Sequence, residues 1–147
     1  MDMTEIPECF YRISSVALVL NETRTKFLII KDDKGWWGLP GGGLDWGATP
    51  QDDIPREIEE EMSLEVIFVA KYPSYFFTNK KPRKSNPEQS IWYAYVVYEV
   101  SLKSLDFSPS DECVAIDFVD RDSLPREKVH NQVLDLAKAF DSQKHIM

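Results

Sequence analysis

The sequence contains little of what a disulfide framework, a zinc site or a membrane span requires. It has two cysteines, Cys9 and Cys113, and two histidines in 147 residues. The cysteines lie far apart and do not form a CxxC pair, which argues against both a disulfide framework and a zinc site. The longest uninterrupted apolar run, Ile91–Tyr98, has eight residues, whereas a bilayer span needs about 20. We therefore expect reduced thiols, a cytoplasmic location and no membrane partner.

Positive charge is also scarce. Lysine and arginine together number 17 against 25 aspartates and glutamates, which gives a net charge of −8. A surface with this balance repels polyanions, so we expect no nucleic acid polymer as a partner. The basic stretch Lys80–Lys84 is the exception; a solvated loop is the favoured interpretation, and contact with phosphates is the alternative. A small phosphorylated ligand that binds through a metal ion is compatible with this charge.

Length and composition favour one globular domain spanning residues 1–147. Hydrophobic residues make up 43% and charged residues 29% of the chain, which is typical of folded proteins rather than disordered ones. Apolar, β-branched segments bounded by turn residues predict a series of strands. They are Ser15–Leu20, Phe27–Lys31, Trp36–Pro40, Leu64–Tyr72, Ser90–Val100 and Val114–Val119.

Two helices complete the predicted fold. Thr49 before Pro50 is a typical helix start, since threonine caps free N–H groups and proline suits the first turn. Ile54, Ile58 and Met62 then recur every four residues. A second helix near the C-terminus is predicted from an apolar stripe at Val129, Val133, Leu136 and Phe140. Strands with two interspersed helices indicate an α+β fold in which helices flank a mixed β-sheet.

Three glutamates on the first helix form the strongest chemical signal. At about 100° per residue, Glu57, Glu60 and Glu61 share one helix face, whereas Glu59 points away. Like charges at this spacing cost a helix roughly a few tenths of a kcal/mol per pair, and a divalent cation with oxygen ligands would offset that repulsion. We therefore predict a Mg²⁺ or Mn²⁺ site; a solvated acidic helix face is the alternative.

Two neighbours of these glutamates favour the metal site. Arg56 lies four residues before Glu60, where a guanidinium can hold a ligand carboxylate in one rotamer. Gly41, Gly42 and Gly43 open the loop that leads into the helix, and glycines there let backbone N–H groups approach a phosphate closely. A glycine loop before three glutamates at metal-ligand spacing is more specific than either feature alone.

These residues resemble the Nudix box, G-x5-E-x7-R-E-U-x-E-E-x-G-U, in which U is a bulky aliphatic residue. The match runs from Gly42 through Arg56–Met62 to Leu64, and the preceding Trp37–Gly42 segment is similar to the family's usual approach to the box. The resemblance implies the Nudix fold, an α/β/α sandwich, over most of the chain. It also implies divalent-metal-dependent hydrolysis of a nucleoside diphosphate linked to another moiety.

The resemblance also implies roles within the box. It makes Glu57, Glu60 and Glu61 metal ligands, with Arg56 orienting them in the catalytic site. Metal ions polarise phosphoryl oxygens and lower the pKa of an attacking water. The general base varies within the family and is either a glutamate of the box or Glu112, which precedes the last predicted strand at a position where relatives often carry a glutamate. For Glu112, a solvated turn is the equally weighted alternative.

Three positions depart from the family pattern. Ala48 stands where the first box glutamate is usual, so one customary carboxylate is missing. Ser63 replaces a glycine at the end of the helix, where a positive φ is often needed. Pro55 falls inside the helix, at a cost of ~3 kcal/mol unless the helix starts late or kinks. The acids that could replace the missing carboxylate are Asp45, Asp52 and Asp53.

These departures make a nucleotide-binding or regulatory module without turnover the alternative to an enzyme. Trp36, Trp37 and Trp46 surround the box and could stack a base, although core packing is favoured for them. The sequence lacks the family's subclass markers for ADP-ribose, dinucleoside polyphosphates and NADH, which leaves nucleoside triphosphates or nucleotide sugars. The predicted partner is thus a small nucleotide-type molecule, and the sequence leaves open whether the chain forms a homodimer.

Overall fold

The computed structural model describes residues 11–82, 85–86 and 88–146 of the chain. A five-stranded sheet has the order β4-β1-β7-β5, with β6 also paired to β7, and a three-stranded sheet has the order β3-β2-β8. The larger sheet consists of β1 (Tyr11–Leu18), β4 (Gly41–Gly43), β5 (Val66–Val69), β6 (Tyr75–Pro82) and β7 (Ser90–Leu102). The smaller sheet consists of β2 (Phe27–Lys31), β3 (Trp37–Gly38) and β8 (Ala115–Val119).

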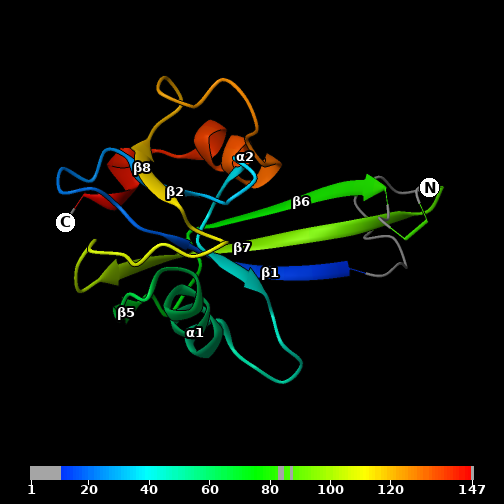
Figure 1. Cartoon of the computed structure of the whole chain (residues 1–147), viewed down its shortest axis with the longest axis horizontal. Helices are drawn as coiled ribbons and strands as arrows, with labels where there is room; N and C mark the ends of the chain where they lie inside the picture. The colour runs from blue at the N-terminus through cyan, green and yellow to red at the C-terminus, as the bar shows by residue number, and fades with distance from the viewer. Residues whose placement is uncertain (1–10, 83–84, 87, 147) are drawn as a thin grey trace.

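Two α-helices lie on opposite sides of the larger sheet (Figure 1). They are α1 (Pro50–Met62) and α2 (Asn131–Ala139), and a 3-10 helix, η1 (Ser142–His145), follows α2. Strand β1 pairs with β7 in parallel, and the other strand pairs are antiparallel. This arrangement confirms the predicted mixed sheet flanked by helices. None of the helices in the described part of the chain is long and apolar enough to cross a membrane.

Alternation along β1 builds a core on each face of the sheet. On one face, Val16 packs with Val133 and Leu136 of α2. On the other, Ala17 packs with Ile58 of α1. Successive residues of a strand point to opposite faces, so one strand contributes to both clusters. The two helical stripes expected from the sequence are therefore the surfaces that cover the sheet.

Helix α1 has the ends that the sequence predicts. Thr49 is the N-cap, and its hydroxyl oxygen accepts the Asp52 N–H at 3.3 Å. Pro50 occupies the first helical position. Ser63 ends the helix in the left-handed region at φ 57°, a conformation that a glycine adopts without steric cost. The helix starts before Pro55 and continues through it, so a helix start after this proline does not occur. Because proline has no N–H, the Gln51 carbonyl lacks its helical donor.

The structure contains a strand that the sequence analysis missed. Strand β6 pairs antiparallel with the outer half of β7. The interpretation of Lys80–Lys84 as a solvated loop is therefore wrong for Lys80, Lys81 and Pro82, which lie in β6; the rest of that stretch falls outside the described residues. An edge strand tolerates lysine and proline because its outer N–H groups need no partner.

The outer ends of β1, β6 and β7 extend beyond both helices (Figure 1). We call this segment the arm and define it as residues Tyr11–Ile13, Thr78–Pro82 and Ser90–Ala94. Strand β1 includes Tyr11–Ser14, ahead of the predicted start at Ser15, because these residues pair with β7 in the arm. At the inner end of the arm the Asn79 amide donates to Asp135 of α2 at 2.6 Å; farther out, the arm presents side chains on both of its faces.

Candidate active site

The three glycines Gly41–Gly43, which the sequence analysis assigns to a loop, form strand β4 and lie against helix α1; we keep the name glycine loop for them. The Gly41 N–H donates to Glu61 Oε1 at 2.9 Å. A Cβ atom on Gly41 would collide with the Ser15 carbonyl oxygen, and one on Gly42 would lie 2.9 Å from the Glu57 carboxyl carbon. A larger residue at Gly41 would therefore push β4 away from β1, and one at Gly42 would displace the Glu57 carboxylate. The glycines bring the backbone into direct contact with two of the predicted ligands.

Burial changes the acid–base behaviour of these two glutamates. Glu61 is 7% exposed, and burial, together with the charges of three other glutamates, raises the pKa of Glu61 to about 8. Burial also raises the pKa of Glu57, although the neighbouring Arg56 acts in the opposite direction. Among the described residues, no lysine or arginine forms an ion pair with Glu61. A buried carboxyl group in this setting is stabilised in its charged form when a cation enters.

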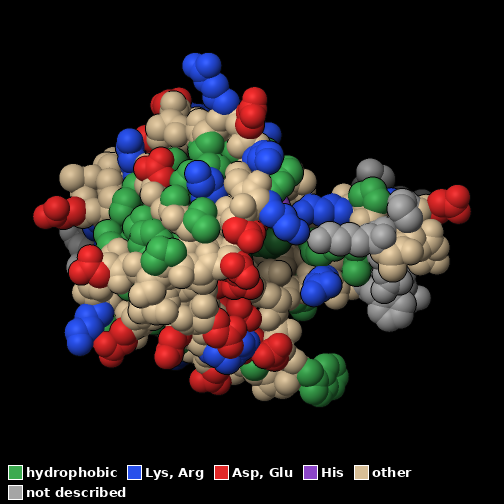
Figure 2. Space-filling model, viewed as in Figure 1, with side chains coloured by type: hydrophobic (Ala, Val, Ile, Leu, Met, Phe, Trp, Pro, Cys, Tyr) green, Lys and Arg blue, Asp and Glu red, His purple; other side chains and the backbone are tan. Residues whose placement is uncertain are grey.

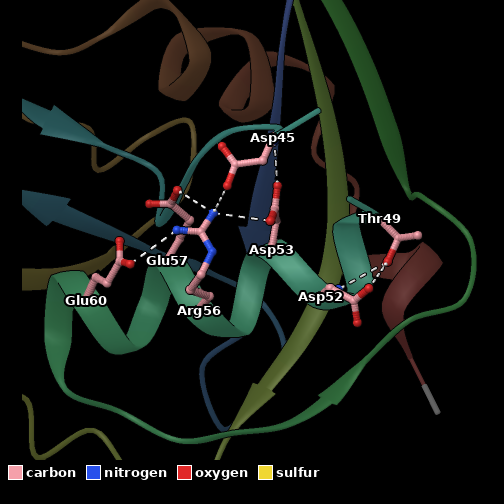
Figure 3. A network of polar contacts seen from close by, with 7 residues as sticks. All are labelled: Asp45, Thr49, Asp52, Asp53, Arg56, Glu57 and Glu60. Carbon is pink, nitrogen blue, oxygen red and sulfur yellow. Dashed lines mark hydrogen bonds and ion pairs between the residues drawn. The ribbon is translucent and has the colours of Figure 1, made fainter. Parts of the chain in front are cut away.

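Arg56 connects four carboxylates around the helix (Figure 3). Its Nη2 atom lies 2.9 Å from Asp45, 3.1 Å from Asp53 and 3.2 Å from Glu57, and its Nη1 atom lies 3.2 Å from Glu60. The hydrogen bond to Asp53 contributes most to raising the pKa of Arg56 above its already high value, so the guanidinium stays charged. A planar group with several donors in a fixed geometry can orient more than one carboxylate at once.

The three acids that could replace the missing box carboxylate lie in different places. Asp45 and Asp53 both contact Arg56, and Asp53 Oδ2 accepts the Asp45 N–H at 2.8 Å. Asp52 lies at the start of the helix, where its carboxylate accepts a hydrogen bond from the N-cap hydroxyl at 3.0 Å (Figure 3). Asp45 and Asp53 are therefore close to the box glutamates, whereas Asp52 serves the helix end.

Helix α1 supplies oxygen donors for a cation without forming a closed set around one point. Glu60 is exposed and bound to Arg56, whereas Glu61 is buried and bound to Gly41. In the described part of the chain, no three histidine, cysteine, aspartate or glutamate side chains are placed to hold a metal ion as they stand. The donor set nevertheless fits Mg²⁺ or Mn²⁺, because every donor is a carboxylate oxygen and the buried one has no cationic partner among the described residues.

A buried hydroxyl next to the glycine loop supports the same interpretation. Ser15 is 1% exposed, and its Oγ atom makes no hydrogen bond with any described residue. Ser15 is the cross-strand partner of Gly42, and strand alternation places its side chain on the α1 face with Ala17. A buried polar atom without a partner costs roughly 1–3 kcal/mol. A water molecule or ion ligand at this point would therefore be stabilised. The sequence analysis missed Ser15 because only the pairing of β1 with β4 brings it to the site.

The loop before β8 brings Glu112 to the same region. The Ser110 hydroxyl donates to the Glu61 carbonyl oxygen at 2.6 Å, which fixes this loop to the end of α1. Glu112 is exposed, and its charge acts on both Glu57 and Glu61. The fold thus brings a carboxylate from a distant part of the sequence to the predicted metal ligands, as a general base requires.

A cavity of about 370 Å³ lies beside Glu61 and Glu112. The Trp36 indole stacks on the His130 ring with the two centroids 5.0 Å apart, and both residues line the cavity. The cavity also has an acidic wall, formed by Asp32, Asp33 and Asp111. The sequence analysis missed His130 and this wall because the β2–β3 turn, the loop before β8 and the start of α2 meet only in the folded chain.

The three tryptophans near the box do not form one stacking surface. Trp36 lines the cavity. Trp37 packs against the core, with the Lys31 ammonium 5.4 Å from its ring. Trp46 lies fully exposed in the loop before α1. Of the three, Trp36 is the one placed to contact a ligand in the cavity.

The described site lies within a segment that matches a known family. The NUDIX domain family model matches residues 11–140. A nucleoside triphosphatase from an Enterobacter species is 28% identical over 92 residues, which cover 61% of this chain and 65% of that relative. An RNA pyrophosphohydrolase from a Nitratiruptor species is 33% identical over 86 residues, which cover 52% of this chain and 56% of that relative. In both comparisons the match spans less than two thirds of the relative's length.

Solved structures show the same fold. The MutT protein from Methanosarcina mazei Go1 superposes with a TM-score of 0.71 at 20% sequence identity, and the match covers 96% of this chain and all of that one. At this identity the likeness concerns the arrangement of helices and strands.

Proposed function

The chain belongs to the NUDIX domain family, and on this premise we propose that it hydrolyses a nucleoside diphosphate linked to another moiety with the help of Mg²⁺ or Mn²⁺. The observation that carries this proposal is the contact between the glycine loop and helix α1. Gly41 binds a buried glutamate, Glu61, while Gly42 leaves room for the Glu57 carboxylate. This contact brings the glycine loop, two carboxylates and the cavity lined by Gly41 and Glu61 next to one another.

Each residue of the box has a definite task in the proposed reaction. Glu57, Glu60 and Glu61 would hold the ion, which would polarise the phosphoryl oxygens and make a bound water more acidic. Arg56 would keep Glu57 and Glu60 oriented through its 3.2 Å contacts. The loop Gly41–Gly43 would let phosphates approach the helix, and the Gly41 N–H would become available to them once Glu61 turns away from it.

Glu112 is the residue we propose as general base. It shares the cavity with Glu61, stays exposed to solvent, and lies on a loop that Ser110 fixes to α1. Because Glu112 is not one of the residues that would hold the metal, its carboxylate would be available to accept the proton of the attacking water. A glutamate of the box itself is the alternative base.

The substrate we propose is a nucleoside triphosphate or a nucleotide sugar. The acidic wall of the cavity repels phosphate, so the phosphates would lie toward the glycine loop while an uncharged part of the substrate enters the cavity and stacks on Trp36. The names of the two relatives, a nucleoside triphosphatase and an RNA pyrophosphohydrolase, agree with a phosphoanhydride as the target.

A panel of nucleoside triphosphates and nucleotide sugars tests this proposal. Each substrate is incubated with Mg²⁺ or Mn²⁺, and release of phosphate or pyrophosphate is measured after coupling to a phosphatase. We expect turnover of at least one member, loss of that turnover in a metal chelator, and little change in Glu59→Gln. Tight binding of a nucleotide without turnover of any member would instead show a binding module.

The absence of a carboxylate at Ala48 is the observation that favours the binding module. Restoring this carboxylate with Ala48→Glu distinguishes an enzyme from a binding module. In an enzyme that works with one carboxylate fewer, Ala48→Glu should lower the metal concentration needed for half-maximal rate. If Asp45 has taken over that role, Asp45→Asn should abolish activity while Ala48→Glu leaves the metal dependence unchanged. The same metal titration, run on both variants and the parent, distinguishes these outcomes.

A further inference from the structure

The side of the arm that continues the α1 face of the sheet is largely apolar, and α1 does not cover it. Strand alternation places Ile13 on this side together with Ala17, which packs on α1. Phe76 of β6 shares the side, because its cross-strand partner Val96 packs in the α1 core cluster. Ile13 is 43% exposed and Phe76 is 62% exposed. We call this surface the apolar face of the arm.

Three rows of cross-strand partners form the apolar face. From the tip inward they are an outer row of Tyr11, Trp92 and Lys80, a middle row of Ile13, Ala94 and Thr78, and an inner row of Ser15, Val96 and Phe76. In the outer row the centres of the Tyr11 and Trp92 rings lie 6.1 Å apart, and the Lys80 ammonium lies 5.8 Å from the centre of the Trp92 ring. The outer and inner rows lie equally far from the middle row, two residues along each strand.

One large apolar side chain stands beside this face without being part of the core. Trp46 is fully exposed in the loop between β4 and α1. This loop starts at the arm, because the Leu44 N–H donates to the Ile13 carbonyl oxygen at 2.9 Å, and it extends past α1 on the side of the arm (Figure 1). Exposed apolar side chains that gather in one place mark an interaction surface.

The arm and the start of α1 carry opposite charges. The residues that define the arm include three cations, of which Lys80 lies on the apolar face, and no aspartate or glutamate. Figure 2 shows a band of acidic side chains across the body, with basic side chains where the arm leaves it. Asp52 is exposed in the first turn of α1. The neighbouring Gln51 amide donates to the Ala70 carbonyl oxygen between β5 and β6 at 3.2 Å, so this turn lies on the β6 side of the sheet.

We propose that the apolar face is the contact surface of a homodimer, in which a second copy of the chain packs the same face against it with the two arms antiparallel. A two-fold axis across the strands at the middle row places each outer row over the partner's inner row. Lys80 then lies over Phe76 of the partner subunit and close to Asp52 of the partner subunit. Two sheets pack face to face about 10 Å apart, so the partner's arm continues the layer that α1 forms over the rest of the sheet.

A second copy fits this surface better than an unrelated protein because one molecule carries both halves of the contact. The outer row offers rings and a cation, whereas the inner row and the start of α1 offer a ring and an acid. The lysines of β6 also disfavour pairing of this edge strand with another strand, which leaves face-to-face packing as the mode of contact. This surface does not depend on the proposed function.

The size of the surface predicts a weak dimer. Three strands about 4.8 Å apart and five residues of about 3.4 Å each give a footprint on the order of 250 Å². Trp46 adds roughly 150–250 Å² per subunit. Interfaces that bury less than about 1,200 Å² in total belong to the weak class. We therefore expect a dissociation constant on the order of 10–100 µM.

Sedimentation velocity of the full chain, at concentrations from about 1 to about 300 µM, tests the proposal. The parent should pass from monomer to dimer over this range. Trp46→Ser should raise the dissociation constant at least about tenfold, and the melting temperature of the monomer should stay the same because this side chain is fully exposed. A circular dichroism melt at low concentration measures that temperature.

A charge exchange tests the predicted register. Lys80→Glu and Asp52→Lys should each weaken the dimer, and the two substitutions in one chain should restore part of the affinity, since the opposite charges then meet again. Lys81→Glu is the matched control, because it makes the same change at the next residue of the same strand, on the opposite face. It should change the dissociation constant less than about threefold.

The outcomes separate this contact from other uses of the surface. A parent that stays monomeric at about 300 µM overturns the proposal, as would happen if another protein or another part of the chain covered the face. Equal losses in Lys80→Glu and Lys81→Glu, or a dimer unchanged by Trp46→Ser and Lys80→Glu, overturn it as well. If the parent forms the dimer and Trp46→Ser dissociates it, but no member of the nucleotide panel is hydrolysed, the contact surface stands and the proposed hydrolase activity fails.

Discussion

Helix α1 and the arm both gather charges of one sign, but they hold them differently. Around α1 the carboxylates are engaged by Arg56 or by the Gly41 N–H. On the arm the lysines rest over aromatic rings, and Arg12 faces solvent. A carboxylate that is bound to an internal partner is held in one orientation and has part of its negative charge offset. A cation over a ring keeps its positive field available. One net charge for the whole chain therefore describes neither region.

Among the variants that test how α1 and the arm hold their charges, Glu57→Gln should have the largest effect, on turnover. The substitution keeps the size of the side chain beside Gly42 but removes the negative charge from the predicted metal site. We expect turnover to fall at least about 100-fold, which corresponds to about 2.7 kcal/mol, and Mn²⁺ affinity measured by calorimetry to fall with it. Glu59→Gln is the control because Glu59 is exposed on another face of α1. Unchanged Mn²⁺ affinity in Glu57→Gln would remove this residue from the metal site.

Arg56→Lys should have the next largest effect. A lysine keeps the charge but cannot contact several carboxylates in fixed directions, as the guanidinium does at 2.9–3.2 Å. We expect kcat/KM to fall about 10- to 100-fold, with part of the loss recovered at high Mn²⁺. Lys80→Arg on the arm, the same exchange in reverse, should leave kcat/KM unchanged. If Arg56→Lys lowers only the melting temperature and leaves the metal dependence intact, its role is structural.

The part of the site that could be predicted from the sequence is the part built by local rules. The capped start of α1, its apolar repeat and the shared face of the glutamates all follow from residue spacing within one helix. The left-handed end at Ser63 could be anticipated because the family pattern has glycine there. Each of these features depends on residues close together in the chain.

The remaining parts depend on contacts between distant segments. Ser15 and His130 gain their positions only when β1 pairs with β4 and when α2 starts beside β3. Strand β6 was missed because its lysines and proline resemble a loop until β7 is placed beside it. Arg12 and Tyr93 likewise lie far apart in the sequence and become cross-strand partners in the sheet.

Ser15→Ala tests whether the unpartnered hydroxyl belongs to the α1 region. Removing a buried hydroxyl without a partner should stabilise the metal-free protein by about 1 kcal/mol, which raises the melting temperature by about 2–4 °C for a chain of this length. If the hydroxyl holds a water at the metal site, Mn²⁺ affinity should fall in the same variant. Ser14→Ala, on the opposite face of β1, is the control. A lower melting temperature in Ser15→Ala would show that the hydroxyl already has a partner.

The smallest expected effect is on the free energy of unfolding, when the two lysines of the arm are replaced one at a time. The Lys81 ammonium lies 5.1 Å from the centre of the Tyr93 ring and 6.0 Å from that of Tyr95. The Lys80 ammonium lies 5.8 Å from the centre of the Trp92 ring. An exposed cation–π contact contributes about 0.5–1 kcal/mol, so Lys81→Met should lower the free energy of unfolding by about that amount and Lys80→Met by less. Methionine keeps most of the apolar stem, which leaves the ammonium as the difference. Denaturant unfolding at low and high salt measures both variants. If both variants lose the same free energy of unfolding at low salt and none at high salt, long-range electrostatic interactions, rather than contact with the rings, account for the contribution of these lysines.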